Sequence, residues 1–452
     1  MISTVRALVC VAALALTACP QQPAVRSAGV KPNVLIIVVD DQRIGSLSVM
    51  PQTRHYFVQG GTNFKQAFVT TPLCCPSRSS IFSGLYAHNH GVINNSPGLA
   101  ENLDQKTLVQ YYLHRAGYRT GLFGKYLNKW RTTQAPPNFD DYSFFSKGEP
   151  YYRGNWNHNG NLVSPRMYST TYIKKLSEQF LRSAEHRDSR PWFLYVATAA
   201  PHGPSVAQDR YKKAPVPFWK GDPAVFERDR SDKPPYVRQD HASLAHGRSV
   251  RKRQLRSLMS VDNMVGQIIK LLHQLGEQRR TLVFFISDNG VAWGDHGLRG
   301  KIVPYTPSIE VPMMMRWPGH VAAGRSDDSL VANIDIAPTI LAAADISPSH
   351  AMDGRSLLGH HTRRSSILTE YTRMPKYNVP TWASIRTDAF QYIEDYNPPG
   401  TKVRFREYYD LKRDPWQLHN LLGDRNTAND PSVQALSRRL AQERSCAGSN
   451  CP

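Results

Sequence analysis

Two apolar segments constrain the fold most strongly, because neither shows the alternation of a half-exposed strand. Residues 34–39 read Val-Leu-Ile-Ile-Val-Val, and residues 281–286 read Thr-Leu-Val-Phe-Phe-Ile. A continuous apolar run of this length predicts a strand buried on both faces, as in a parallel sheet. Residues 192–197 repeat this character, and residues 257–275 carry apolar side chains at helical spacing. Buried strands that alternate with helices predict an α/β fold with a doubly wound, mostly parallel sheet.

The C-terminal part of the chain has a different pattern. Residues 366–422 carry short aromatic strands, such as 390–393, and residues 431–444 are typical of a terminal helix. A length of 452 residues fits one large α/β domain with a smaller C-terminal piece. We therefore expect a main domain at 32–365 and a small antiparallel α+β subdomain at 366–452.

Two segments interrupt the alternation of strands and helices. Residues 136–166 are rich in Tyr, Asn, Pro and Gly, and residues 204–248 are rich in Pro and mixed charge. Both predict long surface loops, which either shape a site or have no fixed role.

The N-terminus has the pattern of an export signal. Arg6 precedes an apolar run at 7–16 that is too short to span a bilayer, and the run ends in Leu-Thr-Ala-Cys at 16–19. This ending resembles the lipobox of bacterial lipoproteins, which predicts a signal peptide at 1–18, a lipid anchor on Cys19 and a tether at 19–31. A plain cleaved signal is the alternative. In both cases we expect an exported protein, lipid-anchored at the outer face of a bacterial membrane or secreted.

The charge balance indicates the kind of partner. Lys and Arg number 56 against 36 Asp and Glu, a formal net charge of +20 that attracts nucleic acid, anionic lipid or acidic polysaccharide. An exported protein meets little nucleic acid, so no nucleic acid is expected as a partner. The basic residues at 248–256 are either a polysaccharide-binding stripe or a solvated helix face.

Polar side chains follow the apolar runs where ligands of open parallel sheets bind. Asp40 and Asp41 follow the first run, Asp288 and Asn289 follow the second, and His202 follows the third. Three carboxylates and an amide oxygen would suit Ca²⁺ or Mg²⁺ better than zinc. The alternative for the Asp pair alone is a cap on a turn.

A cysteine-rich segment carries the most specific signal. In Leu-Cys-Cys-Pro-Ser-Arg at 73–78, Pro76 at a first helical position predicts a helix start. Cys74 would then face free backbone N–H groups that favour an anion, and Arg78 could add a bidentate fork for an oxyanion. A buried free cysteine and an ordinary thiolate nucleophile are the alternatives. At the other end, Cys446 and Cys451 could close a short loop in an oxidising compartment.

The pattern Cys-x-Pro-Ser-Arg at 74–78 resembles the signature of type I sulfatases. The longer segment to Tyr-Ala-His-Asn-His-Gly-Val at 86–92 looks closest to N-acetylglucosamine-6-sulfatases and extracellular heparan 6-sulfatases. The likeness extends from about residue 32 to about residue 422 and implies an alkaline-phosphatase-like fold. It also implies that a formylglycine-generating enzyme oxidises Cys74 to formylglycine, whose aldehyde hydrate attacks sulfur, and that Cys75 is a bystander.

The resemblance also implies roles for other positions. Together with Cys74, the calcium ligands would be Asp40, Asp41, Asp288 and Asn289. Arg78, Lys125 and Lys301 would bind the sulfate, and His202 or Lys301 would protonate the leaving alcohol. The substrate would be a sulfated sugar or aryl sulfate ester, most specifically a 6-sulfated N-acetylglucosamine or a glycosaminoglycan-type sugar. The alternatives are a phosphonate or phosphate monoester hydrolase of the same superfamily and a non-catalytic lipoprotein that binds anionic glycans.

The chain departs from the family pattern at two places. Leu127 stands where many arylsulfatases have a histidine, so Asn128 is expected to reach the site instead. Tyr305-Thr306 replaces the usual Tyr-Glu, and Glu310 stands where a basic residue usually precedes Val-Pro. The second departure bears on how Lys301 is held.

Overall fold

The computed structural model describes residues 31–186, 190–359 and 363–452. The expected signal peptide at 1–18, the lipid-anchored Cys19 and the tether up to residue 30 lie outside these residues. Of the helices in the described ranges, none combines the length and apolar character that crossing a bilayer requires.

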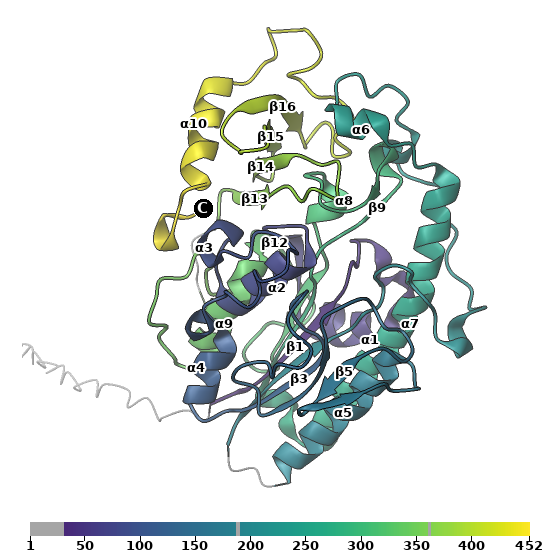
Figure 1. Ribbon diagram of the computed structural model, residues 1–452, viewed down its shortest axis with the longest axis vertical. Helices are drawn as coiled ribbons and strands as arrows, with labels where there is room; N and C mark the ends of the chain where they lie inside the picture. Colours follow the sequence, from purple (N-terminus) through teal and green to yellow (C-terminus); the bar gives the residue numbers. More distant parts are fainter. Residues whose placement is uncertain (1–30, 187–189, 360–362) are drawn as a thin grey trace, which may run out of the picture. The chain divides into compact units, whose positions relative to one another are not determined.

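A ten-stranded sheet forms the centre of the described chain (Figure 1). Its strands, in spatial order, are β12 (Arg325–Ala332), β2 (Thr62–Phe68), β11 (Met313–Arg316), β8 (Thr281–Ser287), β1 (Asn33–Val39), β7 (Trp192–Ala197), β3 (Arg119–Lys125), β4 (Asp141–Phe145), β5 (Trp156–His158) and β6 (Asn161–Val163). The inner strands β8, β1, β7, β3 and β4 are mutually parallel, whereas β11, β5 and β6 run antiparallel to their neighbours. The expected doubly wound, mostly parallel sheet is confirmed.

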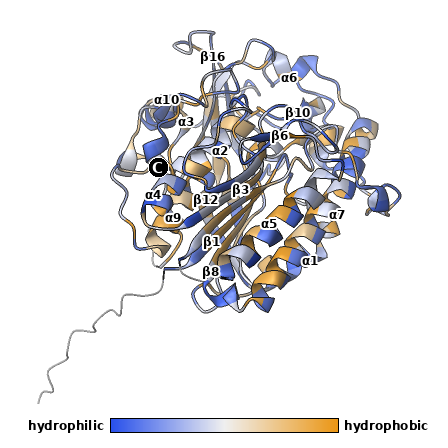
Figure 2. Cartoon of the chain, turned by 60° about the horizontal axis from the view of Figure 1, so that its bottom comes forward, coloured by the Kyte–Doolittle hydropathy of each residue, from blue (hydrophilic) through white to orange (hydrophobic). Residues whose placement is uncertain are grey.

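Both faces of this sheet are covered, which explains the continuous apolar runs. Along β1, Val34, Ile36 and Val38 face one core cluster, and the alternate residues face the other. All of residues 34–39 are fully buried, and burial of each such side chain contributes roughly 1.5–3 kcal/mol to the free energy of unfolding. Figure 2 shows α4 and α9 on one side of the apolar strands and α5, α7 and α1 on the other. The helices are α1 (Pro51–Thr53), α2 (Cys74–Ser83), α3 (Ala87–His90), α4 (Val109–Arg115), α5 (Ser169–Glu185), α6 (Pro235–Gln239), α7 (Leu244–Gln274), α8 (Thr306–Ile309), α9 (Ile336–Ala343) and α10 (Val433–Glu443).

The two segments expected to be loops contain regular structure. Residues 136–166 supply β4, β5 and β6, because Phe144 and Phe145 are buried against the two faces of the sheet. Helix α7 begins at Leu244, well before the expected start at 257, and the Ser243 hydroxyl caps it by accepting a hydrogen bond from the His246 backbone N–H. The first turns of α7 are polar and lack the apolar periodicity on which the prediction was based.

A four-stranded antiparallel sheet follows the main sheet in sequence. Its strands are β13 (Ile367–Tyr371), β14 (Thr381–Arg386), β15 (Phe390–Tyr396) and β16 (Val403–Asp410). Helix α10 accompanies it (Figure 1), and Cys446 and Cys451 form a disulfide. The expected antiparallel α+β character is confirmed, and the boundary between 365 and 366 stays a prediction.

Candidate active site

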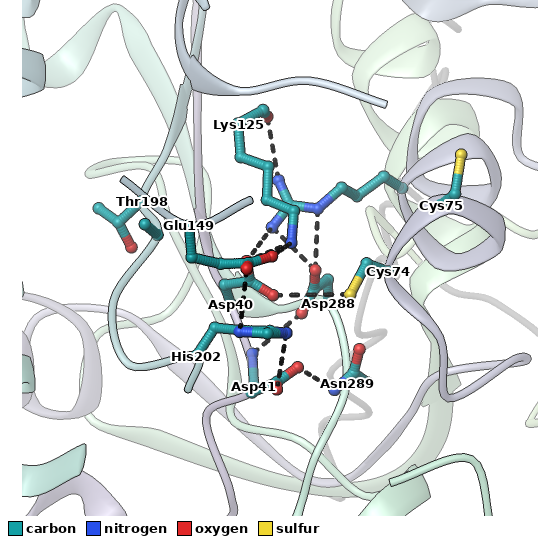
Figure 3. A network of polar contacts seen from close by, with 12 residues as sticks. Asp40, Asp41, Cys74, Cys75, Lys125, Glu149, Thr198, His202, Asp288 and Asn289 are labelled. Carbon is teal, nitrogen blue, oxygen red and sulfur yellow. Dashed lines mark hydrogen bonds and ion pairs between the residues drawn. The ribbon is translucent and has the colours of Figure 1, made fainter. Parts of the chain in front are cut away.

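The ends of β1 and β8 bring four polar side chains to one edge of the main sheet. The strands are parallel and paired up to Val39 and Ser287, so the residues that follow them are neighbours. The Asp41 backbone N–H donates to Asp288 Oδ1 at 3.1 Å, and Asn289 Nδ2 donates to Asp41 Oδ1 at 2.7 Å. Figure 3 shows these side chains and that of Asp40 directed towards a common space.

Helix α2 begins at this space with Cys74. The thiol Sγ lies 3.7 Å from Asp40 Oδ1 and 2.7 Å from Lys301 Nζ, and the residue is 2% exposed. Leu73 is the N-cap in extended conformation, so the helix starts two residues earlier than expected and Pro76 is its third residue. A proline is compatible with this position because the first four N–H groups of a helix have no intrahelical acceptor.

Arg78 lies one helical turn after Cys74 and is fully buried. Its Nε donates to Asp288 Oδ2 at 2.8 Å, and its Nη2 lies 2.8 Å from the same oxygen. Its Nη1 donates to the Lys125 carbonyl oxygen at 3.1 Å and to the Tyr195 hydroxyl at 3.3 Å. The guanidinium therefore fixes Asp288 and the end of β3 while it adds positive charge beside Cys74.

Lys125 is the last residue of β3. Its Nζ lies 2.5 Å from Asp40 Oδ2 and 3.4 Å from Glu149 Oε1, and the side chain is 1% exposed. The preceding Gly124 has φ +115°, and a Cβ there would lie 1.7 Å from the Ala197 carbonyl oxygen. Only glycine allows this approach of β3 to β7, which sets the direction in which Lys125 leaves the strand.

Lys301 follows the short strand β10 (Arg299–Gly300), which pairs with β9 (Ala292–Trp293). Besides Cys74, its Nζ contacts Asp41 Oδ1 at 2.5 Å and Asn289 Oδ1 at 3.2 Å. The lysine ammonium thus lies among oxygen atoms expected to bind a cation. Although the chain departs from the family pattern at Glu310, Lys301 still contacts Cys74.

His202 lies on the other side of Asp41. Its Nε2 is 3.5 Å from Asp41 Oδ2, and its Nδ1 is 2.8 Å from the Gly203 carbonyl oxygen and 3.7 Å from Glu149 Oε2. The Tyr151 hydroxyl donates to the His202 carbonyl oxygen at 2.6 Å and so holds the backbone of this residue.

Opposite charges keep the carboxylates ionised. Burial alone would raise the pKa of Asp40, but Lys125 and His202 outweigh it and hold that pKa below its ordinary value. Burial also opposes ionisation of Asp41, whose pKa is nevertheless lowered by His202 and Lys301.

The cationic side chains are stabilised in the same way. Burial would lower the pKa of Lys125 and Lys301, but Asp40 and Asp41 respectively raise both above the ordinary value. Burial raises the pKa of the Cys74 thiol to about 12 despite the two lysines. An unmodified Cys74 is therefore a thiol at neutral pH, which disfavours the alternative of an ordinary thiolate nucleophile.

The donor atoms fit a hard divalent cation. Asp40, Asp41, Cys74 and His202 each place one candidate ligand atom within 4.8 Å of the others. Asp288 and Asn289 are hydrogen-bonded to Asp41 and add two more oxygen-bearing side chains to this group. Oxygen is therefore the most frequent donor element. The position of the Lys301 ammonium among these atoms shows that the space already attracts positive charge.

Sequence reasoning missed Glu149 and Tyr151, which lie in the segment expected to be a surface loop, and Tyr195, which reads only as a buried strand residue. No local pattern distinguishes them.

Asn128, by contrast, was expected to reach the site. Its backbone carbonyl accepts from the Cys75 thiol at 3.6 Å, and its buried side-chain oxygen has no hydrogen-bond partner within the described ranges.

Comparison with protein families gives two matches. Residues 32–346 match the family described as Sulfatase, and residues 294–445 match N-sulphoglucosamine sulphohydrolase, C-terminal. The chain is 30% identical to human N-acetylglucosamine-6-sulfatase, with 93% of this chain and 86% of that protein covered. It is 34% identical to the extracellular sulfatase SULF-1 homolog of Drosophila melanogaster over 73% of this chain, but it spans only 31% of that protein's length.

Solved structures share the fold at low identity. The structure of BT4656 in complex with its substrate D-glucosamine-2-N,6-O-disulfate has a TM-score of 0.80 at 20% identity, covering 92% of this chain and 98% of that one. The phosphonate monoester hydrolase of Agrobacterium radiobacter has a TM-score of 0.71 at 21% identity, covering 91% and 95%. These likenesses confirm the expected alkaline-phosphatase-like fold.

Proposed function

The chain belongs to the sulfatase family, and on that basis we propose that it hydrolyses sulfate esters of 6-sulfated N-acetylglucosamine or glycosaminoglycan-type sugars. The observation that carries the proposal is the position of Cys74 Sγ, 2.7 Å from the Lys301 ammonium and 3.7 Å from the Asp40 carboxylate. The resemblance to type I sulfatases, first noted at residues 74–78, agrees with the family match over residues 32–346.

The cationic groups supply what a sulfate monoester needs. Its anionic charge repels a nucleophile unless the site neutralises it and holds the sulfur in line for attack. Lys125 and Arg78 are buried beside Cys74, and the Lys301 side chain is 13% exposed. The pKa values of all three are raised, so all three carry their charge without a protonation step. We assign sulfate binding to the two lysines. Arg78 adds charge and orients Asp288.

We propose that Asp40, Asp41, Asp288 and Asn289, together with residue 74, hold a calcium ion. Their oxygen donors favour calcium or magnesium over zinc. When bound, the ion supplies positive charge that offsets the charge on the sulfate oxygens.

We also propose that a formylglycine-generating enzyme oxidises Cys74 to formylglycine. At position 74 the hydrated aldehyde would supply a nucleophilic hydroxyl and a second hydroxyl that a serine lacks. Cys74 faces the acidic and cationic groups, whereas Cys75 faces Asn128, so the geometry favours position 74 as the one that reacts.

His202 is suited to protonate the leaving alcohol. With Nδ1 donating to the Gly203 carbonyl oxygen, Nε2 is directed towards Asp41, and the ring lies beside the carboxylates of Asp41 and Glu149. Proton transfer from Nε2 to the departing oxygen would release a neutral alcohol. Lys301 is the alternative proton donor.

The choice of sugar rests on relatives. The human relative is named for N-acetylglucosamine-6-sulfate, and the BT4656 structure contains a 6-sulfated glucosamine. Export agrees with the N-terminal pattern, with the Cys446–Cys451 disulfide and with the extracellular Drosophila relative. Anchoring to a membrane through lipid on Cys19 remains part of the proposal.

Mass spectrometry and kinetics test this function together. The tryptic peptide 66–78 should carry the mass of formylglycine in place of Cys74. The purified protein should cleave an aryl sulfate and N-acetylglucosamine-6-sulfate in preference to an aryl phosphate. Active enzyme with an unmodified Cys74 would contradict the mechanism.

A phosphonate or phosphate monoester hydrolase is the second candidate, because enzymes of that type share the fold. A higher kcat/KM for aryl phosphate or phosphonate than for aryl sulfate would favour it. Complete lack of turnover with retained glycan binding would instead indicate a non-catalytic lipoprotein.

A further inference from the structure

A cavity of about 690 Å³ opens directly beside the candidate site. Asp41, His202 and Lys301 form its inner wall, and Tyr377 and Asn378 belong to its outer lining. This volume lies within the range of about 300–1,000 Å³ that is usual for small-molecule sites.

A second cavity, of about 380 Å³, continues the first. It lies between α6 and the strands β15 and β16, which Figure 1 shows near one another. Four residues line both cavities: Tyr236, Gln239, Asn378 and Val379. The two cavities therefore form one groove that leads from Lys301 to the small antiparallel sheet.

The outer cavity is strongly cationic. Arg238, Arg373 and Arg404 line it and are exposed. Within the ranges that the structure describes, no carboxylate lies within ion-pair distance of any of them. The acidic side chain in the lining is Asp395, and burial together with Glu407 raises its pKa well above the ordinary value, which favours its uncharged form.

The inner cavity has fewer uncompensated charges. Arg299 forms an ion pair with Asp240 at 3.1 Å, so its charge is partly balanced. Arg253, on α7, donates to the Ser249 hydroxyl at 2.8 Å and has no carboxylate partner among the described residues. Of the basic residues at 248–256, Arg253 is thus the one whose charge faces this groove.

We propose that the groove binds an anionic oligosaccharide whose sulfated sugar reaches Lys301 while a sulfate or carboxylate further along the same chain binds Arg238, Arg373 and Arg404. This inference rests on the proposed function and narrows its substrate from 6-sulfated sugars in general to a polyanionic chain. Arginine is suited to the role because its planar fork matches sulfate and carboxylate groups. Three such forks without acidic partners carry a charge complementary to that of a sulfated chain.

Binding to the Cys74→Ala protein tests the proposal without turnover. The probes are N-acetylglucosamine-6-sulfate, a heparan-type hexasaccharide with that sugar at its non-reducing end, and a chitin-type hexasaccharide with a single terminal 6-sulfate. Calorimetry should show the heparan-type probe binding most tightly. Its affinity should fall with added salt more steeply than that of the other two.

In the Cys74→Ala protein, the further substitutions Arg238→Ser and Arg404→Ser together should weaken binding of the heparan-type probe by roughly tenfold. This is the scale of losing a charge-assisted hydrogen bond. Binding of the other two probes should change little. The charge-matched control is Arg182→Ser with Arg438→Ser, two exposed arginines that line neither cavity.

Equal affinity for all three probes would overturn the proposal, as would an equal loss in the control pair. In the protein with Cys74 intact, the groove pair should raise KM for the heparan-type probe and leave aryl sulfate turnover unchanged. Failure of the proposed function would appear separately, as an unmodified Cys74 and absent aryl sulfate turnover in the parent protein.

Discussion

Cys74 and Cys75 are adjacent in sequence, but their side chains leave α2 in different directions (Figure 3). The Cys74 thiol lies 2.7 Å from Lys301 Nζ, whereas the Cys75 thiol lies 3.6 Å from the Asn128 carbonyl oxygen and belongs to an apolar core cluster. Successive helical residues are about 100° apart, so one chain segment presents a reactive position and a packing position side by side.

The two cysteines should therefore respond differently to substitution. We expect Cys74→Ala to abolish turnover because the nucleophile is lost, and Cys75→Ala to keep most activity while costing about 1 kcal/mol of stability. Initial rates on an aryl sulfate and thermal unfolding of both variants measure this. Equal loss of activity in the two would mean that position 74 is not the nucleophile.

Lys301→Met should reduce kcat/KM by roughly 10²–10³-fold, because a cation beside the reacting group is removed. Lys174→Met is the matched control, since Lys174 pairs with Glu178 on the surface of α5, away from the site. Steady-state kinetics on one substrate with both variants give the comparison. A loss below threefold would show that Lys301 makes no contact important to the transition state.

Removal of divalent metal should abolish activity and leave secondary structure intact. The carboxylates Asp40, Asp41 and Asp288 repel one another when a chelator extracts the ion, but Arg78, Lys125 and Lys301 remain to compensate them. Dialysis against a chelator, followed by elemental analysis and re-addition of calcium or magnesium, measures this. Full activity of protein shown to be metal-free would remove the ion from the mechanism.

Arg78→Ala should destabilise the protein by about 3–5 kcal/mol, because it leaves Asp288 buried without its cationic partner. Arg78→Lys should recover part of the stability but little of the activity, since an ammonium cannot contact Asp288, the Lys125 carbonyl and Tyr195 together. Denaturant unfolding and kinetics of the two variants test this. An Arg78→Lys enzyme as active as the parent would contradict it.

Asp395→Asn should stabilise the protein increasingly as pH rises. Burial and Glu407 raise the pKa of Asp395 in the folded state. The protonated carboxyl therefore contributes folding stability that is fully present below the unfolded pKa of 3.8, and this stability is lost as pH rises through the folded pKa. The variant's Tm should exceed that of the parent by a margin that grows as pH rises above the unfolded value. A constant or shrinking margin would show that this carboxyl titrates normally.

The main fold could be predicted because burial on both faces leaves a direct mark on a strand. Residues 34–39 and 281–286 are continuous and apolar, and they became β1 and β8 at the centre of the sheet. The short strands β5 and β6 could not be predicted, because each is three residues long and neither shows an apolar periodicity. The early part of α7 was missed because it lacks that periodicity as well.

The candidate site, like the fold, could be predicted from the sequence only in part. Asp40, Asp41, Asp288 and Asn289 follow recognisable strands, and the parallel pairing of β1 with β8 brings them together. Glu149 comes from an irregular segment between β4 and β5, where its place beside His202 depends on the path of the whole loop. Cys74, Lys125 and Lys301 were located through resemblance to a family, and their mutual distances required the structure.

The groove has one further consequence, which concerns how the substrate specificity of such an enzyme can change. Its inner end is built from residues up to 303, whereas Arg404 belongs to β16 and Arg373 to the connection between β13 and β14. Exchanging these two arginines would alter the outer contacts, while Arg238 on α6 and the residues around Cys74 would stay in place. Protein engineering at these positions would therefore retarget the enzyme to another polymer.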